Sequence, residues 1–501
     1  MKLKAIRMGI DTHQEFVVYI RADAAVVRAE GFTSSVRVMI SDERQEAIAT
    51  LNVVDADKLE DGCVGMSNAL WDVFDPEHDV AISHAPVVSS MSQVRAKIYN
   101  RHLSAPELSD IIRDIARGYY SDVQISAFLS ACAGSRLSLD EITSLTSAMV
   151  NVGHRLTWPG ISHIYDKHCI GGLPGNRTTP LVVAIASACG LVVPKTSSRA
   201  ITSPAGTADT MEVMTPVDLG IDDMRRVVES TGACLAWGGA MGLSPVDDLL
   251  IRVERILDLD SKGQMVASVL SKKIAAGSTH ILIDVPVGAT AKVRNLDTAH
   301  GLMASFEHVG NALGVHVQCV ITDGSQPVGN GIGPSLEARD VLAVLRGDAG
   351  APEDLRQKSL ELAAHMLTMG LGLAYDDAWE KARQVLDSGQ ALQQFERICR
   401  AQGGFTEPVP APFTRVLAAH QDGHVNAIDS RRIARLAKLA GAPKVPVAGL
   451  DLHVKLGDRV SKDDALLTIH AQTEGELDYA LLYYLHNRDM IFLEDKPCPA
   501  S

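Results

Sequence analysis

The feature that most constrains the fold is an alternation of glycine-rich loops, apolar helices and short apolar strands that begins near residue 164. Residues 178–189 are almost uninterruptedly apolar and predict a buried helix that starts near Thr179. Residues 191–194 and 281–285 are short β-branched runs and predict buried strands. Strands that alternate with helices form a largely parallel sheet, whose ligands usually lie at the carboxyl ends of the strands. We therefore predict an α/β domain over residues 164–403 with a ligand site at that edge.

The first third of the chain predicts two further domains, because 501 residues exceed what one hydrophobic core usually organises. Residues 1–90 contain short β-branched runs between polar turns, for example residues 16–20 and 36–40, and predict a β-rich N-terminal domain. Nothing in this domain has a catalytic pattern, so we expect a structural or assembly role.

Residues 94–160 predict a small all-helical domain. A serine is followed three residues later by Glu or Gln at Ser104, Ser121 and Ser138. This spacing is typical of a capping box, in which the two side chains satisfy free N–H groups at the start of a helix. Apolar residues follow each box at helical spacing.

The last part of the chain predicts an α+β domain over residues 412–501, preceded by a proline-rich linker over residues 404–412. Its turns resemble those of biotinyl and lipoyl carriers, but no exposed Met-Lys-Met turn is present, which argues against a carrier role. The predicted fold class is therefore multidomain α/β.

Charge and cysteine pattern exclude several classes of function. The formal net charge of −14 argues against a general nucleic-acid binder, because phosphate backbones are held by an excess of Lys and Arg. The eight cysteines include no Cys-x-x-Cys pair, so neither a zinc site nor a disulfide framework is indicated. No apolar run is long enough to span a bilayer, and no apolar segment follows the basic N-terminus. We expect a cytoplasmic protein without a metal.

Residues 166–180 predict an anion-binding loop. Their glycines let the backbone approach a ligand, and the helix that follows offers unpaired N–H groups. Lys167 adds a full positive charge. A loop of this composition is also compatible with a plain tight turn.

Residues 195–212 follow a predicted strand and are rich in hydroxyl groups. Hydroxyl and backbone donors suit phosphate oxygens and sugar hydroxyls. By itself, this segment is equally typical of a polar surface loop.

Together, the two loops carry a family signature. The first reads Lys-His-x-x-Gly-Gly from Lys167, and Ser-x-Arg at Ser197 and Gly-Thr-x-Asp-x-Met-Glu at Gly206 follow it. This combination resembles the thymidine phosphorylases, whose relatives include pyrimidine-nucleoside phosphorylases and archaeal AMP phosphorylases. The extended motifs, Lys-His-x-Ile-Gly-Gly-x-Pro-Gly-Asn and Thr-Ser-Ser-Arg-Ala-Ile-Thr-Ser-Pro-Ala-Gly-Thr, are similar to the long branch of that family. The resemblance covers residue 94 to the C-terminus, and the additional N-terminal domain also fits the long branch.

The resemblance implies roles for individual residues. It places a catalytic histidine near the scissile bond at His168. The expected phosphate ligands are Lys167, Thr179, Ser197 and Thr207. The residues expected to bind the nucleoside or nucleotide include Gly172, Ser198, Arg199, Ala200, Ile201, Thr202, Ser203 and Thr207.

A third segment, residues 252–273, is expected to face the nucleobase. Ser268 and Lys272 are four residues apart and therefore share a helix face, which is also compatible with a solvated surface. By resemblance, this pair contacts the base and Lys272 is catalytic, a proton donor falls at Asp260, and Lys292 contacts the nucleotide. From the physical pattern alone, Asp260 near a helix start is a cap.

The base side departs from the short thymidine phosphorylases. They carry Tyr-Ala-Leu-Arg-Asp, whose arginine contacts the pyrimidine, whereas this chain has Leu-Ser-Pro-Val-Asp-Asp at residues 243–248. The resemblance leads us to expect phosphorolysis of a nucleoside, in which thymidine and phosphate give thymine and 2-deoxy-α-D-ribose 1-phosphate. The departure at residues 243–248 favours the alternative substrate, a nucleoside 5′-monophosphate such as AMP. A phosphoribosyltransferase and a non-catalytic nucleotide sensor stay open as weaker alternatives.

The expected partners are small molecules only: a nucleoside or nucleotide, with inorganic phosphate as co-substrate. No organic cofactor, metal, nucleic acid or membrane is expected. By resemblance, the protein is a homodimer or a larger homo-oligomer.

Overall fold

The computed structural model describes residues 2–12, 14–74, 79–200, 203–257, 259 and 261–495. The chain divides into two compact units. The first contains Met1–Val152 and Pro245–Gln264, and the second contains Gly153–Ser244 and Met265–Ser501. Each unit is described by itself.

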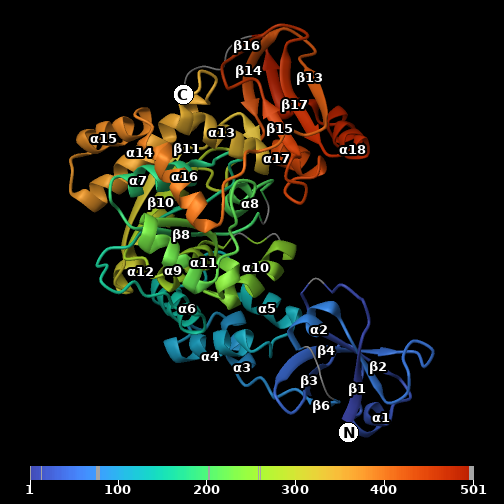
Figure 1. Ribbon diagram of the computed structural model, residues 1–501. Helices are drawn as coiled ribbons and strands as arrows, with labels where there is room; N and C mark the ends of the chain where they lie inside the picture. Colours follow the sequence, from blue (N-terminus) through green and yellow to red (C-terminus); the bar gives the residue numbers. More distant parts are fainter. Residues whose placement is uncertain are drawn as a thin grey trace. The chain divides into compact units, whose positions relative to one another are not determined.

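In the described part of the first unit, the N-terminal residues form a closed barrel with strand order β1-β5-β2-β4-β3-β6 (Figure 1, blue). Alternate side chains enter its core, as in β3, where Val38 and Ile40 are fully buried between partly exposed neighbours. Strands β2 and β3 occupy the two β-branched runs that predicted them. The elements are β1 (Lys2–Arg7), β2 (Val17–Arg21), α1 (Ala25–Glu30), β3 (Arg37–Ser41), β4 (Glu46–Val54), β5 (Cys63–Met66), α2 (Asn68–Phe74) and β6 (Val80–His84).

A helical bundle completes the first unit, and all three predicted capping boxes are present at its helix starts. At Ser138, for example, the backbone N–H donates to Glu141 Oε2 at 3.0 Å, and the serine Oγ accepts from the Glu141 N–H at 3.2 Å. The guanidinium of Arg252 joins the fifth helix to the others through Asp122 at 2.6 Å. The bundle consists of α3 (Met91–Ile98), α4 (Ala105–Ala116), α5 (Asp122–Cys132), α6 (Leu139–Asn151) and α10 (Pro245–Leu257).

The α/β part of the second unit is built on parallel strands, as the sequence predicts. Strands β11, β10 and β7 form one parallel sheet in that order, and β8 and β9 form a second parallel pair. The strand expected at residues 191–194 instead begins at Val193 and runs through Lys195 to Ser197, so the apolar run covers only its start. The strands are β7 (Tyr165–Cys169), β8 (Val193–Ser197), β9 (Ala233–Trp237), β10 (His280–Val287) and β11 (His316–Asp323).

Helix α7 lies within a hydrophobic core of the second unit, in contact with α14 and α16. It begins at Thr178, one residue before the predicted start, and residues 178–187 are all buried. A helix that is apolar on every side is stable only when neighbours cover all its faces. The helices of this domain are α7 (Thr178–Ala188), α8 (Thr207–Glu212), α9 (Ile221–Thr231), η1 (Gly238–Met241), α11 (Lys262–Ala275), α12 (Leu296–Ala312), α13 (Pro334–Arg346), α14 (Glu353–Leu371), α15 (Tyr375–Asp387) and α16 (Gln390–Gln402).

The C-terminal part of the second unit is the predicted α+β domain (Figure 1, red). One of its sheets includes the short strand β12 of the preceding domain, because Gly331 pairs with Asp451 and Ile332 pairs with Leu450. The elements are β12 (Gly331–Ile332), β13 (Phe413–Ala418), β14 (Gly423–Ile428), α17 (Ser430–Leu439), β15 (Gly449–Leu452), β16 (Arg459–Val460), β17 (Ala465–Ala471), α18 (Glu474–Leu485), η2 (Arg488–Met490) and β18 (Ile491–Glu494). Among the described residues, no helix combines the length and apolar character that a bilayer crossing requires.

Candidate active site

Strand β7 places Lys167 in a buried polar network. Its Nζ donates to Thr178 Oγ1 at 2.7 Å and lies 3.6 Å from Asp284 Oδ2. Thr322 Oγ1 donates to the other carboxylate oxygen of Asp284 at 2.6 Å. Burial acts to raise the pKa of Asp284, but the positive charges of Lys167 and Lys358 hold it below its ordinary value. Lys167 therefore anchors the first turn of α7 and sits beside Thr179, the next predicted phosphate ligand.

The neighbouring position on β7 carries a second buried network. The carboxylate of Asp166 pairs with Lys195 Nζ at 3.0 Å and with Lys273 Nζ at 2.8 Å. Both lysines also donate to the carbonyl oxygen of Thr196 at 2.8 Å. This network joins β7, which carries Lys167 and His168, to β8, which carries Ser197, and to α11, which carries Lys272.

His168 is surrounded by positive charge. Burial lowers its pKa well below the usual range, and the charges of Lys273, Lys195, Lys272 and Lys167 lower it further. The imidazole is therefore neutral near pH 7. A neutral imidazole can donate one hydrogen bond and accept another, but it is not a reservoir of an acidic proton.

The glycine-rich loop passes close to Lys292. Gly172 has φ +82°, and a Cβ atom there would lie 2.5 Å from the backbone nitrogen of Lys292. Only glycine allows both this backbone conformation and this approach. The loop and Lys292, predicted separately as nucleotide contacts, are thus neighbours.

Arg177 ties the two predicted substrate loops together. Its Nε donates to Glu337 Oε2 at 2.5 Å, its Nη1 to Thr207 Oγ1 at 3.1 Å, and its Nη2 to the carbonyl of Ala205 at 3.0 Å. Glu337 is 1% exposed. One planar guanidinium therefore fixes the first loop, the second loop and α13, a geometry that lysine does not reproduce.

The second loop is closed on itself by Asp209, whose Oδ2 accepts from the backbone nitrogens of Ala200 at 2.6 Å and Gly206 at 2.8 Å. A Cβ atom on Gly206 would lie 2.6 Å from the carbonyl oxygen of Ser198. Arg199 pairs with Glu212 and lies 4.8 Å from the centroid of the Trp237 ring. These contacts hold Arg199 at the base of the loop, while Ser198 is exposed.

Helix α11 contains both Ser268 and Lys272, which confirms that they share a helix. Both are half-buried, as is Met265, whereas most of the helix between them is buried. These positions, three and four residues apart, form one partly open stripe. The Ser268 carbonyl accepts from Ser271 Oγ at 3.2 Å.

The structure brings most of the predicted site residues to one region of the second unit. Lys167, Thr179, Ser197 and Thr207 lie on elements joined by the Lys167, Asp166 and Arg177 networks. Ser203 is half-buried, and its Oγ donates to the Ala205 carbonyl at 2.9 Å. Asp260, Ile201 and Thr202 lie outside the described residues.

Sequence reasoning did not assign Asp166, Lys195, Lys273, Arg177 or Glu337. Lys195 directly follows the predicted apolar strand, and the structure shows it buried; a lysine is almost never fully buried unless it is paired. The partner of Lys195 is distant in the sequence, so the sequence does not indicate which residue it is. No group of three or more metal-ligating side chains is found within the described ranges.

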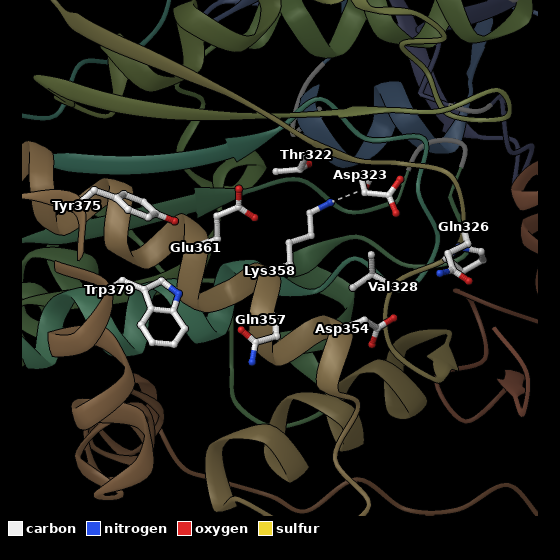
Figure 2. Close-up of a pocket in the computed structure, with 11 residues that line it drawn as sticks. Thr322, Asp323, Gln326, Val328, Asp354, Gln357, Lys358, Glu361, Tyr375 and Trp379 are labelled. Atoms are coloured by element: carbon white, nitrogen blue, oxygen red, sulfur yellow. Dashed lines mark hydrogen bonds between the residues drawn. The ribbon is translucent and has the colours of Figure 1, made fainter. Parts of the chain in front are cut away.

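A pocket of about 340 Å³ opens beyond the carboxyl end of β11 (Figure 2). Tyr375 and Trp379 of α15 line one side, Gln326 lies on the opposite side, and Lys358 reaches the carbonyl of Asp323 at 3.2 Å. The predicted site residues with described coordinates are not among those that line it. The pocket adjoins the network around Lys167, because Thr322, which lines it, donates a hydrogen bond to Asp284.

Three family models match the chain. Residues 92–153 match the helical bundle domain of a glycosyl transferase family, and residues 162–392 match the a/b domain of that family. Residues 424–487 match the pyrimidine nucleoside phosphorylase C-terminal domain.

Full-length relatives agree with these models. The chain is 56% identical over 493 residues to "Putative thymidine phosphorylase 1" of Acidovorax sp. (strain JS42), covering 98% of this chain and 96% of the relative. It is 53% identical over 492 residues to "Putative thymidine phosphorylase" of Hahella chejuensis (strain KCTC 2396), covering 98% and 97%. The fold is also similar to anthranilate phosphoribosyltransferase from Thermus thermophilus, with a TM-score of 0.52 and 19% identity over 62% of this chain and 98% of that one.

Proposed function

We propose that this chain cleaves the N-glycosidic bond of a nucleoside with inorganic phosphate. The premise is that the chain belongs to this glycosyl transferase family and is an enzyme of the pentosyltransferase type. The proposed reaction converts thymidine and phosphate into thymine and 2-deoxy-α-D-ribose 1-phosphate. The observation that carries it is the positive charge that Lys167, Lys272 and Lys273 place around His168, because a reaction with phosphate needs a preformed anion site beside the sugar.

In the proposed mechanism, the loop after β7, with Ser197 and Thr207, holds phosphate below the anomeric carbon. A phosphate oxygen forms a bond to that carbon as the carbon–nitrogen bond breaks, and the bonding electrons leave with the base. Neutral His168 orients the sugar through hydrogen bonds, and the ammonium of Lys272, with Ser268, stabilises the negative charge that develops on the base. A proton donor at Asp260 completes the proposal. No cofactor is required.

The second candidate substrate is a nucleoside 5′-monophosphate. One observation of the structure favours it: Lys292 approaches the loop at Gly172, which places a lysine beside that loop for a second phosphate group. The segment at residues 243–248 also lacks the arginine that the short thymidine enzymes use on the pyrimidine.

The test is phosphate-dependent base release from thymidine, uridine, AMP, CMP and UMP, measured in parallel by chromatography. Release from thymidine supports the first candidate, and release from AMP without release from thymidine replaces it with the second. Absence of release from all five substrates refutes phosphorolysis and favours a nucleotide sensor. Lys272→Ala serves as the inactive control for traces of other phosphorylases in the preparation.

We also propose that the enzyme acts in the cytoplasm as a homodimer or larger homo-oligomer. Light scattering of the purified protein and fractionation of its host cell test these two points.

A further inference from the structure

Two amines share one carboxylate beneath the proposed phosphate site. Lys195 and Lys273 lie 3.0 and 2.8 Å from the two oxygens of Asp166 and donate to the same carbonyl oxygen of Thr196. The three side chains are 3%, 4% and 0% exposed. If both amines are ammonium ions, the cluster holds one net positive charge away from water, which is unfavourable without a counter-charge.

Asp166 is the acidic group that raises the pKa of Lys195 in this cluster. On β7, His168 is neutral and Lys167 pairs with its own carboxylate, Asp284. On β9, burial raises the pKa of Cys234, which keeps its thiol protonated. On α11, Lys272 adds positive charge. Ser197, a proposed phosphate ligand, lies two residues along β8 from Lys195, so a phosphate dianion bound there would bring a counter-charge close to the cluster.

We propose that Lys195 is a positioning residue for phosphate, and that its amine is largely neutral in the empty site and takes up a proton from solvent when the phosphate dianion binds. The inference rests on the proposed function, since it concerns the phosphate of that reaction. No covalent step is involved: one amine takes up a proton and becomes an ammonium ion, and the cluster then carries one net positive charge that faces the bound anion.

Burial, reinforced by the charge of Lys273 and opposed by Asp166, lowers the pKa of Lys195 to about 7, in agreement with this assignment. For such a pKa, roughly nine tenths of the amine is neutral at pH 8 in the empty site. Binding of an anion raises the pKa, so the bound state holds more protons than the free state. By linkage, phosphate affinity then falls as pH rises above about 7, by up to about tenfold per pH unit.

The first experiment measures the KM for phosphate, expressed as the dianion, from pH 6.5 to pH 9 in the full-length enzyme. Lys195→Met keeps the length of the side chain and removes its charge. At pH 7 its KM for phosphate is expected to be about tenfold or more above wild type, and the difference shrinks toward pH 9, where the wild-type amine is neutral as well. The KM for the nucleoside is not expected to follow this pattern. Lys358→Met, a buried lysine near the other carboxylate, is the matched control and keeps the wild-type pH slope.

The second experiment measures proton uptake directly. Inorganic phosphate is titrated into the full chain at pH 8 by calorimetry in Tris and in HEPES, whose heats of ionisation differ. Wild type is expected to take up close to one proton per phosphate, and Lys195→Met none. Lys273→Met removes the competing cation, so Lys195 is already charged at pH 8 and uptake is lost there too.

Equal pH slopes for wild type and Lys195→Met overturn the inference, as does phosphate binding without proton uptake or no binding at all. If the enzyme still shows phosphorolysis while these results are obtained, the inference about Lys195 is wrong but the proposed function stands. Conversely, proton-linked phosphate binding in a chain that releases no base supports the role of Lys195 and refutes the proposed function.

Discussion

Replacing Arg177 with methionine tests whether the buried contact with Glu337 holds the substrate loops in place. In the wild type, Arg177 is 8% exposed and Glu337 is 1% exposed. Burial already raises the pKa of Glu337, against the lowering effect of Arg177. After the substitution, the carboxyl group keeps only weaker contacts, from the backbone of Gly333 at 3.2 Å and the hydroxyl of Thr210 at 3.3 Å.

The expected loss of folding stability follows from the burial of both residues. Removing one partner of a buried ion pair leaves an uncompensated charge and typically costs about 3–5 kcal/mol. A shift of this size lowers the melting temperature of a domain of 150–250 residues by roughly 6–20 °C. The double variant Arg177→Met with Glu337→Gln removes the uncompensated charge and is expected to recover at least half of the loss.

Differential scanning calorimetry of the single and double variants measures the change in melting temperature, with the transition of the α/β domain as the readout. Arg383→Met is the control, because its ion pair with Glu380 at 2.6 Å is on the surface and is worth at most about 1 kcal/mol. A single variant that melts within the range of this control, or a double variant no better than the single one, refutes the argument for a buried anchor. The KM for phosphate should rise in parallel, because Thr207 loses its donor.

Three shorter predictions follow from other contacts. Gly172→Ala places a Cβ atom 2.5 Å from the backbone nitrogen of Lys292 and is expected to lower kcat/KM by about tenfold or more. Gly190→Ala, where the added Cβ atom has open space around it, is expected to leave kcat/KM unchanged, and steady-state kinetics of the two variants test this. Lys272→Ala is expected to abolish base release with an unchanged melting temperature, and loss of folding would contradict this. Burial and two neighbouring histidines lower the pKa of His280, so the unfolded chain binds protons more readily and stability should fall as pH drops below about 6.5. Melting curves from pH 5.5 to pH 7.5 should show a smaller change in His280→Gln than in wild type.

Local signals in the sequence predicted much of the fold. The three capping boxes and the apolar run of α7 depend on neighbours within a few residues, so they are visible without a structure. The closure of the N-terminal barrel is different, because β1 pairs with both β5 and β6 and these contacts depend on distant segments. The shift of β8 toward Ser197 has a similar reason: Lys195 ends the apolar pattern, but its pairing with Asp166 lets the strand continue.

The parts of the candidate site that could be predicted are those whose sequence pattern lies within one short segment. The motifs around His168 and Ser197 pick out two loops that Arg177 ties together in the structure. The groups that fix these loops were missed because each is half of a pair: Arg177 meets Glu337 across 160 residues, and Lys195 meets Asp166 across 29. A buried charge indicates that it has a partner but not which residue the partner is.

The most direct test of phosphorolysis is the fate of the phosphate itself. ³¹P NMR of the enzyme with thymidine and inorganic phosphate, and in a second sample with AMP and inorganic phosphate, follows the phosphorus signal while chromatography follows the base. We predict a new sugar 1-phosphate signal that grows in equal amount to the free base, and no base release when phosphate is left out. Base release that continues without phosphate, or that yields no sugar phosphate, would contradict the account.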